Sequence, residues 1–99
     1  MDRDELGALA AFVAVAEERS FTRAAKRLGV SPSALSHAVR GLEERMGVRL
    51  LARTTRSVAR TDAGEQLYAR LKPALDDVHL AVDEVSSLRD RPAGRVRLL

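Results

Sequence analysis

The chain has 99 residues, 45% hydrophobic and 31% charged, which is enough for one small domain with its own core. It contains no cysteine, which excludes disulfides, zinc–cysteine sites and thiol nucleophiles. The apolar runs are too short to span a bilayer and the start MDRDELG is unlike a signal peptide, so we expect no membrane partner and a cytoplasmic location.

The net charge of +3 hides an uneven distribution along the chain. Residues 20–61 hold nine Arg or Lys and two Glu, a net charge of +7, whereas residues 62–90 hold three basic and seven acidic residues, a net charge of −4. A concentrated basic block is typical of a phosphate-binding surface. A solvated basic face is the alternative interpretation.

The first predicted helix covers residues 5–18, with Asp4 as its N-cap. Its apolar positions recur at helical spacing and predict a buried stripe. That stripe comprises Leu6, Leu9, Val13 and Ala16, with Phe12 beside it. We assign Phe12 and Phe21 to the core, because base stacking needs a series of exposed aromatic residues.

A short second helix is predicted over residues 23–28, capped by Thr22 and ended by Gly29. Ser31 and Pro32 then start a third helix at once, with a hydroxyl at the N-cap and proline at the first helical position. A connection of about three residues forces the sharp corner of a helix-turn-helix. The expected shared core of the corner is Ala25, Leu28, Val30, Leu35 and Val39.

The third helix, residues 32–46, has two different faces. One predicted face is apolar and consists of Leu35, Val39, Leu42 and Met46. The opposite face is small, polar and basic and consists of Ser33, Ser36, His37 and Arg40. Such a face can approach a polyanion and offer hydrogen bonds to base edges, so we interpret this helix as a recognition helix.

Residues 48–60, after Gly47, predict a weak β-hairpin whose tip is Arg53–Arg56. No Asn-Gly or Asp-Gly pair is present, so we expect a tip longer than two residues. A basic hairpin after a helix-turn-helix is a wing, whose arginines suit phosphates or a narrow minor groove. The predicted fold class is therefore mainly α, a winged helix-turn-helix of residues 1–61 followed by a long helix.

That long helix, residues 62–90, is capped by Thr61. Its apolar residues follow a period of 3.5, which is typical of a seam between two helices and predicts a homodimer. The seam consists of Leu71, Leu75, Val78, Val82 and Val85. Pro73 predicts a kink or a break. Residues 91–99 change to a Pro-Gly break and a strand-like run, which we interpret as the start of a further domain.

The run SFTRAAKRLGVSPSALSHAVRGLEERMGVRLLARTTRSVARTDAGE resembles the N-terminal DNA-binding region of LysR-type transcriptional regulators. The resemblance covers residues 5 to about 90. It implies a winged helix-turn-helix, a linker helix that pairs with its twin in antiparallel fashion, and a C-terminal effector domain of two α/β lobes. A small-molecule effector is expected only for that domain, and no cofactor is expected in this chain.

The resemblance also implies DNA contacts by position. Those in the major groove are Pro32, Ser33, Ser36 and His37, those in the wing are Arg53 and Arg56, and phosphates are held by Thr22 or Ser31. Many members have Arg where this chain has His37. A neutral imidazole cannot make the bidentate guanine contact of Arg, which bears on base preference at that step.

The leading hypothesis is a sequence-specific module for double-stranded DNA, acting as a homodimer on an inverted repeat, with RNA polymerase a further candidate partner. The basic residues expected on phosphates are Arg23, Lys26, Arg40, Arg53 and Arg56. The alternative is a dimeric helix-turn-helix adaptor for protein contacts, whose binding would be insensitive to salt. An enzyme is the poorest interpretation, because no motif places a nucleophile beside a base, and no residue spacing predicts a metal site.

Overall fold

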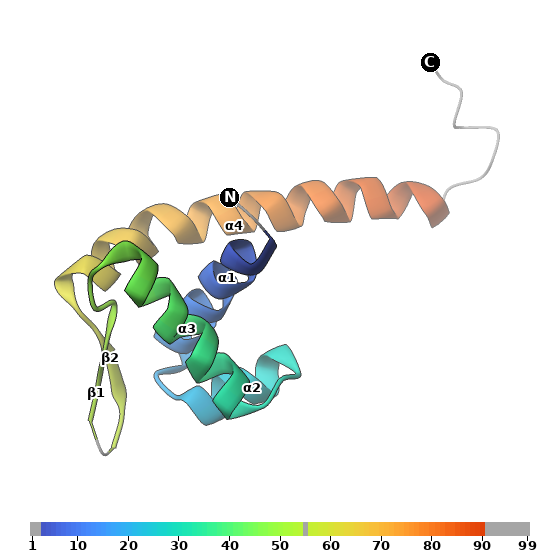
Figure 1. Ribbon diagram of the computed structural model, residues 1–99. Helices are drawn as coiled ribbons and strands as arrows, with labels where there is room; N and C mark the ends of the chain where they lie inside the picture. The colour runs from blue at the N-terminus through green and yellow to red at the C-terminus, as the bar shows by residue number, and fades with distance from the viewer. Residues whose placement is uncertain (1–2, 55, 91–99) are drawn as a thin grey trace.

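The computed structural model describes residues 3–54 and 56–90. The elements, in chain order, are α1 (Arg3–Glu18), α2 (Phe21–Leu28), α3 (Pro32–Met46), β1 (Leu51–Arg53), β2 (Val58–Arg60), α4 (Asp62–Ser87) and the 3₁₀ helix η1 (Leu88–Asp90). The three short helices and the β1–β2 hairpin form a head, and α4 runs along one side of it and projects beyond it (Figure 1). This confirms the predicted winged helix-turn-helix followed by a long helix. The residues 91–99 assigned to a further domain lie outside the described part of the chain.

Helix α1 is the centre of the head and is buried more completely than an amphipathic stripe requires. Leu9, Phe12, Val13 and Ala16 are buried as predicted. The intervening Ala8, Ala11, Ala14 and Val15 are buried as well, because α2, α3, α4 and β2 all contact this helix. Two predictions were wrong: Leu6 is 49% exposed, and the helix begins at Arg3, before Asp4.

Helix α2 begins earlier than predicted, and its N-cap is Ser20 rather than Thr22. The Ser20 side-chain oxygen accepts a hydrogen bond of 3.1 Å from the Arg23 backbone N–H, and Thr22 is an exposed residue of the first turn. Gly29 ends the helix at φ 73°, in the left-handed region that favours glycine, as predicted.

Helix α3 has the predicted caps. The Ser31 hydroxyl oxygen accepts a hydrogen bond of 3.1 Å from the Ala34 N–H, Pro32 follows at the first turn, and Gly47 ends the helix at φ 72°.

The core of the corner is smaller than predicted. Leu35, Val39 and Leu42 are buried, together with Ala25 of α2, but Met46, Leu28 and Val30 are 44%, 40% and 46% exposed. Helix α2 packs through the small Ala24 and Ala25 and the half-buried Phe21. The three exposed side chains lie at the ends of α2 and α3 or in the turn, and Leu50 and Leu51 fill the core instead.

The hairpin is antiparallel, with Leu51 opposite Arg60 and Arg53 opposite Val58. Leu51 and Val58 are buried and anchor it to the head. Arg53 therefore belongs to β1 and not to the tip. The turn between the strands is closed by Thr54, whose N–H donates to the Ser57 carbonyl oxygen at 2.9 Å and whose hydroxyl accepts from the Ser57 N–H at 2.9 Å.

The first turn of α4 lies directly against the base of the wing. Thr61 is the N-cap of α4, as predicted, and its hydroxyl accepts from the Gly64 N–H at 3.0 Å. The same hydroxyl donates to the Arg49 carbonyl oxygen at 2.6 Å. The Thr61 N–H donates to the Leu50 carbonyl oxygen at 3.0 Å. A Cβ atom on Gly64 would overlap that same carbonyl oxygen, so this close approach requires glycine.

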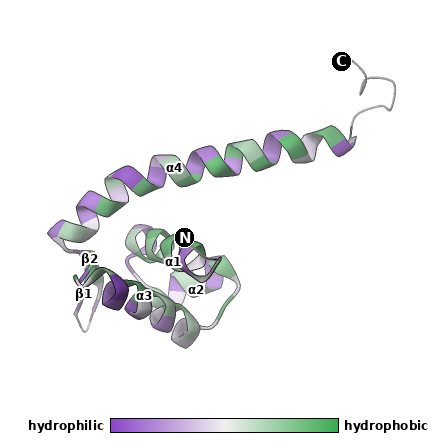
Figure 2. Cartoon of the chain, turned by 45° about the horizontal axis from the view of Figure 1, so that its top comes forward, coloured by the Kyte–Doolittle hydropathy of each residue, from purple (hydrophilic) through white to green (hydrophobic). Residues whose placement is uncertain are grey.

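The predicted seam of α4 divides into two parts, which corrects the assignment of all five residues to a partner chain. Leu75 is buried and Leu71 is half-buried, and both pack against the core of their own head. Val78, Val82 and Val85 are 51%, 56% and 67% exposed. Figure 2 shows hydrophobic and hydrophilic positions alternating along the projecting half of the helix. The helix continues through Pro73, so of the kink or break expected there, the break is absent. Within the described residues, no helix is both long and apolar enough to cross a membrane.

Candidate nucleic-acid interface

The predicted polar face of α3 is accessible. Ser33, His37 and Arg40 are exposed and Ser36 is half-buried, on the side opposite the buried Leu35, Val39 and Leu42. Figure 1 shows the α2–α3 corner and the tip of the hairpin extending from the same side of the molecule, away from α4. Helix α4 therefore does not cover this surface, which is open to a large ligand.

Arg53 joins the wing to this face. Its guanidinium Nη1 donates to Ser36 Oγ at 3.1 Å, and its Cζ lies 4.2 Å from the centroid of the Phe21 ring, a cation–π contact. Burial lowers the pKa of Arg53, and the nearby positive charge of Arg40 lowers it further. Sequence reasoning placed Arg53 in the wing correctly but gave it no partner on α3.

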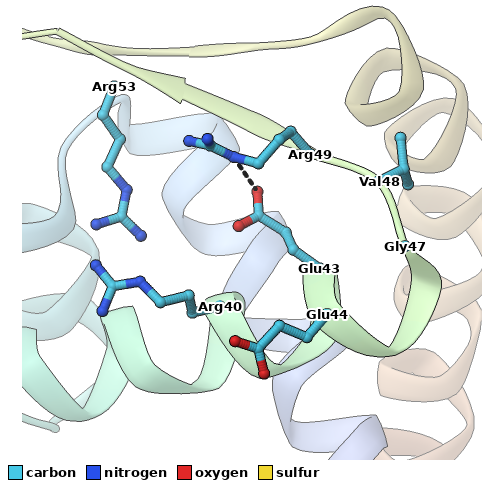
Figure 3. Close-up of a pocket in the computed structure, with 7 residues that line it drawn as sticks. All are labelled: Arg40, Glu43, Glu44, Gly47, Val48, Arg49 and Arg53. Carbon is cyan, nitrogen blue, oxygen red and sulfur yellow. Dashed lines mark ion pairs between the residues drawn. The ribbon is translucent and has the colours of Figure 1, made fainter.

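An open groove of about 540 Å³ lies between the end of α3 and β1. Figure 3 shows Arg40 from α3 and Arg53 from β1 with their guanidinium groups directed toward one another across it. Arg49 also lines this groove and forms an ion pair with Glu43, with its Nε 3.7 Å from Glu43 Oε2. Two guanidinium groups that face each other repel, and a phosphate group between them would relieve the repulsion.

Glu43 is one of the residues whose role sequence reasoning missed. Its side chain is buried, and its Oε2 accepts from the backbone N–H groups of Leu50 and Leu51 at 2.8 and 3.1 Å. The carboxylate thereby fixes the start of the wing to α3. The neighbouring Glu44 is exposed.

Three of the remaining predicted contact residues, Arg23, Ser31 and Arg56, form hydrogen bonds of their own. Arg23 is 67% exposed but donates from Nη2 to the Glu18 carbonyl oxygen at 2.8 Å. The Ser31 oxygen serves the helix cap and lies 3.4 Å from Ser33 Oγ. Arg56 is exposed in the wing turn, its backbone N–H donating to the Thr54 hydroxyl at 3.2 Å. Contact of these residues with DNA stays a prediction.

A second network, also missed, holds α4 against the head. Glu17 of α1 accepts from the Tyr68 hydroxyl at 2.6 Å and pairs with Lys72 at 3.1 Å and with Arg27 at 2.9 Å. Burial raises the pKa of Glu17, but the hydrogen bonds from Tyr68, Lys72 and Arg27 outweigh it and lower the pKa to about 2. In the described residues, no group of three or more His, Cys, Asp or Glu side chains is arranged to bind a metal ion.

The model of the bacterial regulatory helix-turn-helix proteins of the lysR family matches residues 6–65. The chain belongs to this family. It is 56% identical over 98 residues to the HTH-type transcriptional regulator PgrR of Escherichia coli, covering 99% of this chain and 33% of PgrR. It is 46% identical over 93 residues to PtxR of Pseudomonas aeruginosa, covering 94% of this chain and 30% of PtxR. This LysR-family chain thus spans about a third of the length of these relatives.

The solved structures that resemble this LysR-family chain include DNA-binding domains. The BenM DNA-binding domain in complex with catB site 1 DNA superposes with a TM-score of 0.77 at 35% identity, covering 93% of this chain and 99% of that one. A mutant of OxyR from Corynebacterium glutamicum superposes with a TM-score of 0.79 at 38% identity, covering 86% of this chain and 26% of that one.

Proposed function

We propose that this chain is the DNA-binding head and linker helix of a LysR-type transcriptional regulator and that it binds double-stranded DNA sequence-specifically in the cytoplasm. The observation that carries the proposal is the accessible polar and basic face of α3 beside a basic wing, with Arg40 and Arg53 converging on one groove. Structures of the BenM DNA-binding domain with catB and benA site DNA support it.

In this proposal, α3 and the wing make different contacts with the DNA. Helix α3 lies in the major groove, where Ser33, Ser36 and His37 read base edges, and the wing lies on the backbone or in the minor groove. The arginines contact phosphates and set the register of the protein on the duplex.

The exposed half of α4 carries the proposed dimer contact. Val78, Val82 and Val85 are apolar and solvent-exposed in a single chain, and a second copy of the same helix would cover them. Two heads related by a two-fold axis would bind an inverted repeat whose half-sites are one or more helical turns apart. RNA polymerase, and an effector that binds outside this chain, are further proposed partners of the full-length regulator.

The direct test is a gel shift on the promoter next to the gene, repeated at several salt concentrations. Binding should weaken steeply as salt rises, because phosphate contacts release counterions. Arg56→Ala should weaken binding to all duplexes alike, and Ser36→Ala should change the preference among them. A chain that binds no duplex at low salt would refute the proposal and favour the protein-binding adaptor.

A further inference from the structure

The hydrogen bond between Arg53 and Ser36 joins two residues that are 17 positions apart, one in the wing and one on the recognition helix. The guanidinium has a second contact, with the Phe21 ring of α2, which is itself half-buried against the core. Three elements, β1, α2 and α3, therefore fix the position of this side chain. Arg56, the other wing arginine that we predict to contact DNA, lies exposed in the turn.

The bond constrains what the Ser36 hydroxyl can offer to a ligand. A serine hydroxyl has one donor and two acceptor sites, whereas an arginine side chain has donors only. Arg53 therefore occupies an acceptor site of Ser36, and within residues 3–54 and 56–90 no acceptor is paired with the hydroxyl hydrogen. A hydrogen bond received from a cation also polarises the O–H bond, which makes the hydroxyl a stronger donor and a poorer acceptor.

We infer that Arg53 is a specificity-determining residue that sets Ser36 as a hydrogen-bond donor toward DNA. The base edge selected by Ser36 then carries an acceptor, which is O6 or N7 of guanine, N7 of adenine or O4 of thymine. The N4 amino group of cytosine is a donor and is disfavoured at that step. A serine without such a partner contacts either kind of group. This inference rests on the proposed function, since it concerns how the same face reads a base.

The test starts from a pool of duplexes with a randomised centre, from which the wild-type chain selects a preferred sequence. Each base of that sequence is then changed to cytosine, and affinities are measured for wild type, Ser36→Ala, Arg53→Met and the double variant. At one position of the half-site, wild type should lose about 5-fold or more in affinity on the change to cytosine. We call the affinity for the preferred base divided by the affinity for cytosine at that position the cytosine ratio. Both single variants should reduce the cytosine ratio to below about 2-fold, and the double variant should reduce it no further.

Arg56→Met is the matched control, because it removes the same charge from the same wing without touching Ser36. It should weaken all duplexes alike and leave the cytosine ratio unchanged. Arg53→Lys, which restores a cationic donor, should recover part of the ratio, and thermal unfolding confirms that each variant is folded.

The outcomes separate this inference from the proposed function. If Arg53→Met weakens every duplex by the same factor and keeps the cytosine ratio, Arg53 is a phosphate contact alone; the inference is then wrong while DNA binding stands. If the wild-type chain enriches no sequence, the proposed sequence-specific function fails and the inference fails with it.

Discussion

Glu43 lies on the buried side of α3, where one carboxylate oxygen accepts two backbone N–H groups of the wing. Glu43→Ala would leave both buried donors without an acceptor, so we expect a loss of about 2 to 4 kcal/mol in the free energy of unfolding. The control is Glu44→Ala, because Glu44 is the exposed neighbour and its removal should change stability by less than about 0.5 kcal/mol. Urea unfolding at one protein concentration measures both, and equal effects of the two variants would contradict this role for Glu43.

Gly64 is required by the close approach of α4 to the residue that precedes β1. In Gly64→Ala the new Cβ would overlap the Leu50 carbonyl oxygen, so the backbone must shift, at a cost of about 1 to 3 kcal/mol. Gly7→Ala is the opposite case, since a Cβ atom added there would have no atom within 4 Å and the residue is exposed in α1. It should stabilise the chain by about 0.5 to 1 kcal/mol. A thermal unfolding series in which Gly64→Ala leaves the stability unchanged or raises it would exclude the proposed overlap.

Neither Glu43 nor Gly64 could be recognised from its sequence neighbourhood. A glutamate after Leu42 reads as the polar border of an amphipathic helix, because the backbone N–H groups that it satisfies lie seven and eight residues away. The clash at Gly64 depends on where the chain passes before β1. The misplaced cap of α2 has a simpler cause: Ser20 and Thr22 both carry a hydroxyl, and only the geometry distinguishes them.

At the scale of elements, the Glu17 network joins α1, α2 and α4 and makes their packing dependent on pH. The pKa of Glu17 is lowered from 4.5 to about 2 in the fold, so the folded state binds its proton less readily than the unfolded chain. This contribution, about 3 kcal/mol at about 1.36 kcal/mol per pKa unit, is fully present above pH 4.5 and is lost as the pH falls toward 2.

Glu17→Gln should therefore lower stability at neutral pH and flatten the fall in stability between pH 4.5 and 2. Tyr68→Phe removes one of the three donors to Glu17 and should give an intermediate slope. Denaturant unfolding across this pH range measures the slopes. An unchanged slope in Glu17→Gln would show that other carboxylates account for the acid sensitivity.

The elements themselves were largely predictable because their boundaries are set by local chemistry. Gly29, the Ser31–Pro32 pair and Thr61 act on their own turns, and the structure confirms each of them. Burial at element ends was not predictable in this way. Leu28 and Val30 fit the apolar pattern but lie where no neighbour covers them, which periodicity cannot show.

At the scale of the whole molecule, the two halves of α4 meet different surroundings. The first half packs on its own head through Leu71 and Leu75, and the second half leaves Val78, Val82 and Val85 exposed. The seam pattern runs through both halves without a change of period, so the sequence predicted one continuous interface. Only the position of α1 beside the first half shows where the self-contact ends.

Val82→Glu should therefore shift the chain from dimer to monomer, because it places a charge in the middle of the proposed apolar contact. His79→Glu adds a charge at an exposed position outside the seam and should leave the dimer intact. Sedimentation equilibrium measures the association, and we expect a weakening of about tenfold or more for Val82→Glu alone. Equal behaviour of the two variants would place the partner elsewhere.

The residues on the surface of the candidate interface could be predicted from the sequence, but the hydrogen bonds between them could not. The polar side of α3 and the basic wing follow from periodicity and charge, whereas the bond from Arg53 to Ser36 depends on the strand register and on the place of Phe21.

Thr61 belongs to two elements at once, since its hydroxyl caps α4 and donates to the Arg49 carbonyl oxygen at the foot of the hairpin. A chimera that joins this head to the linker helix of another protein must therefore keep both Thr61 hydrogen bonds. A splice between Arg49 and Gly64 separates the partners and leaves the hairpin without its support. A splice beyond Leu75 keeps every one of these bonds within the transplanted piece, so we expect the head to keep its fold when it is joined to another helix there.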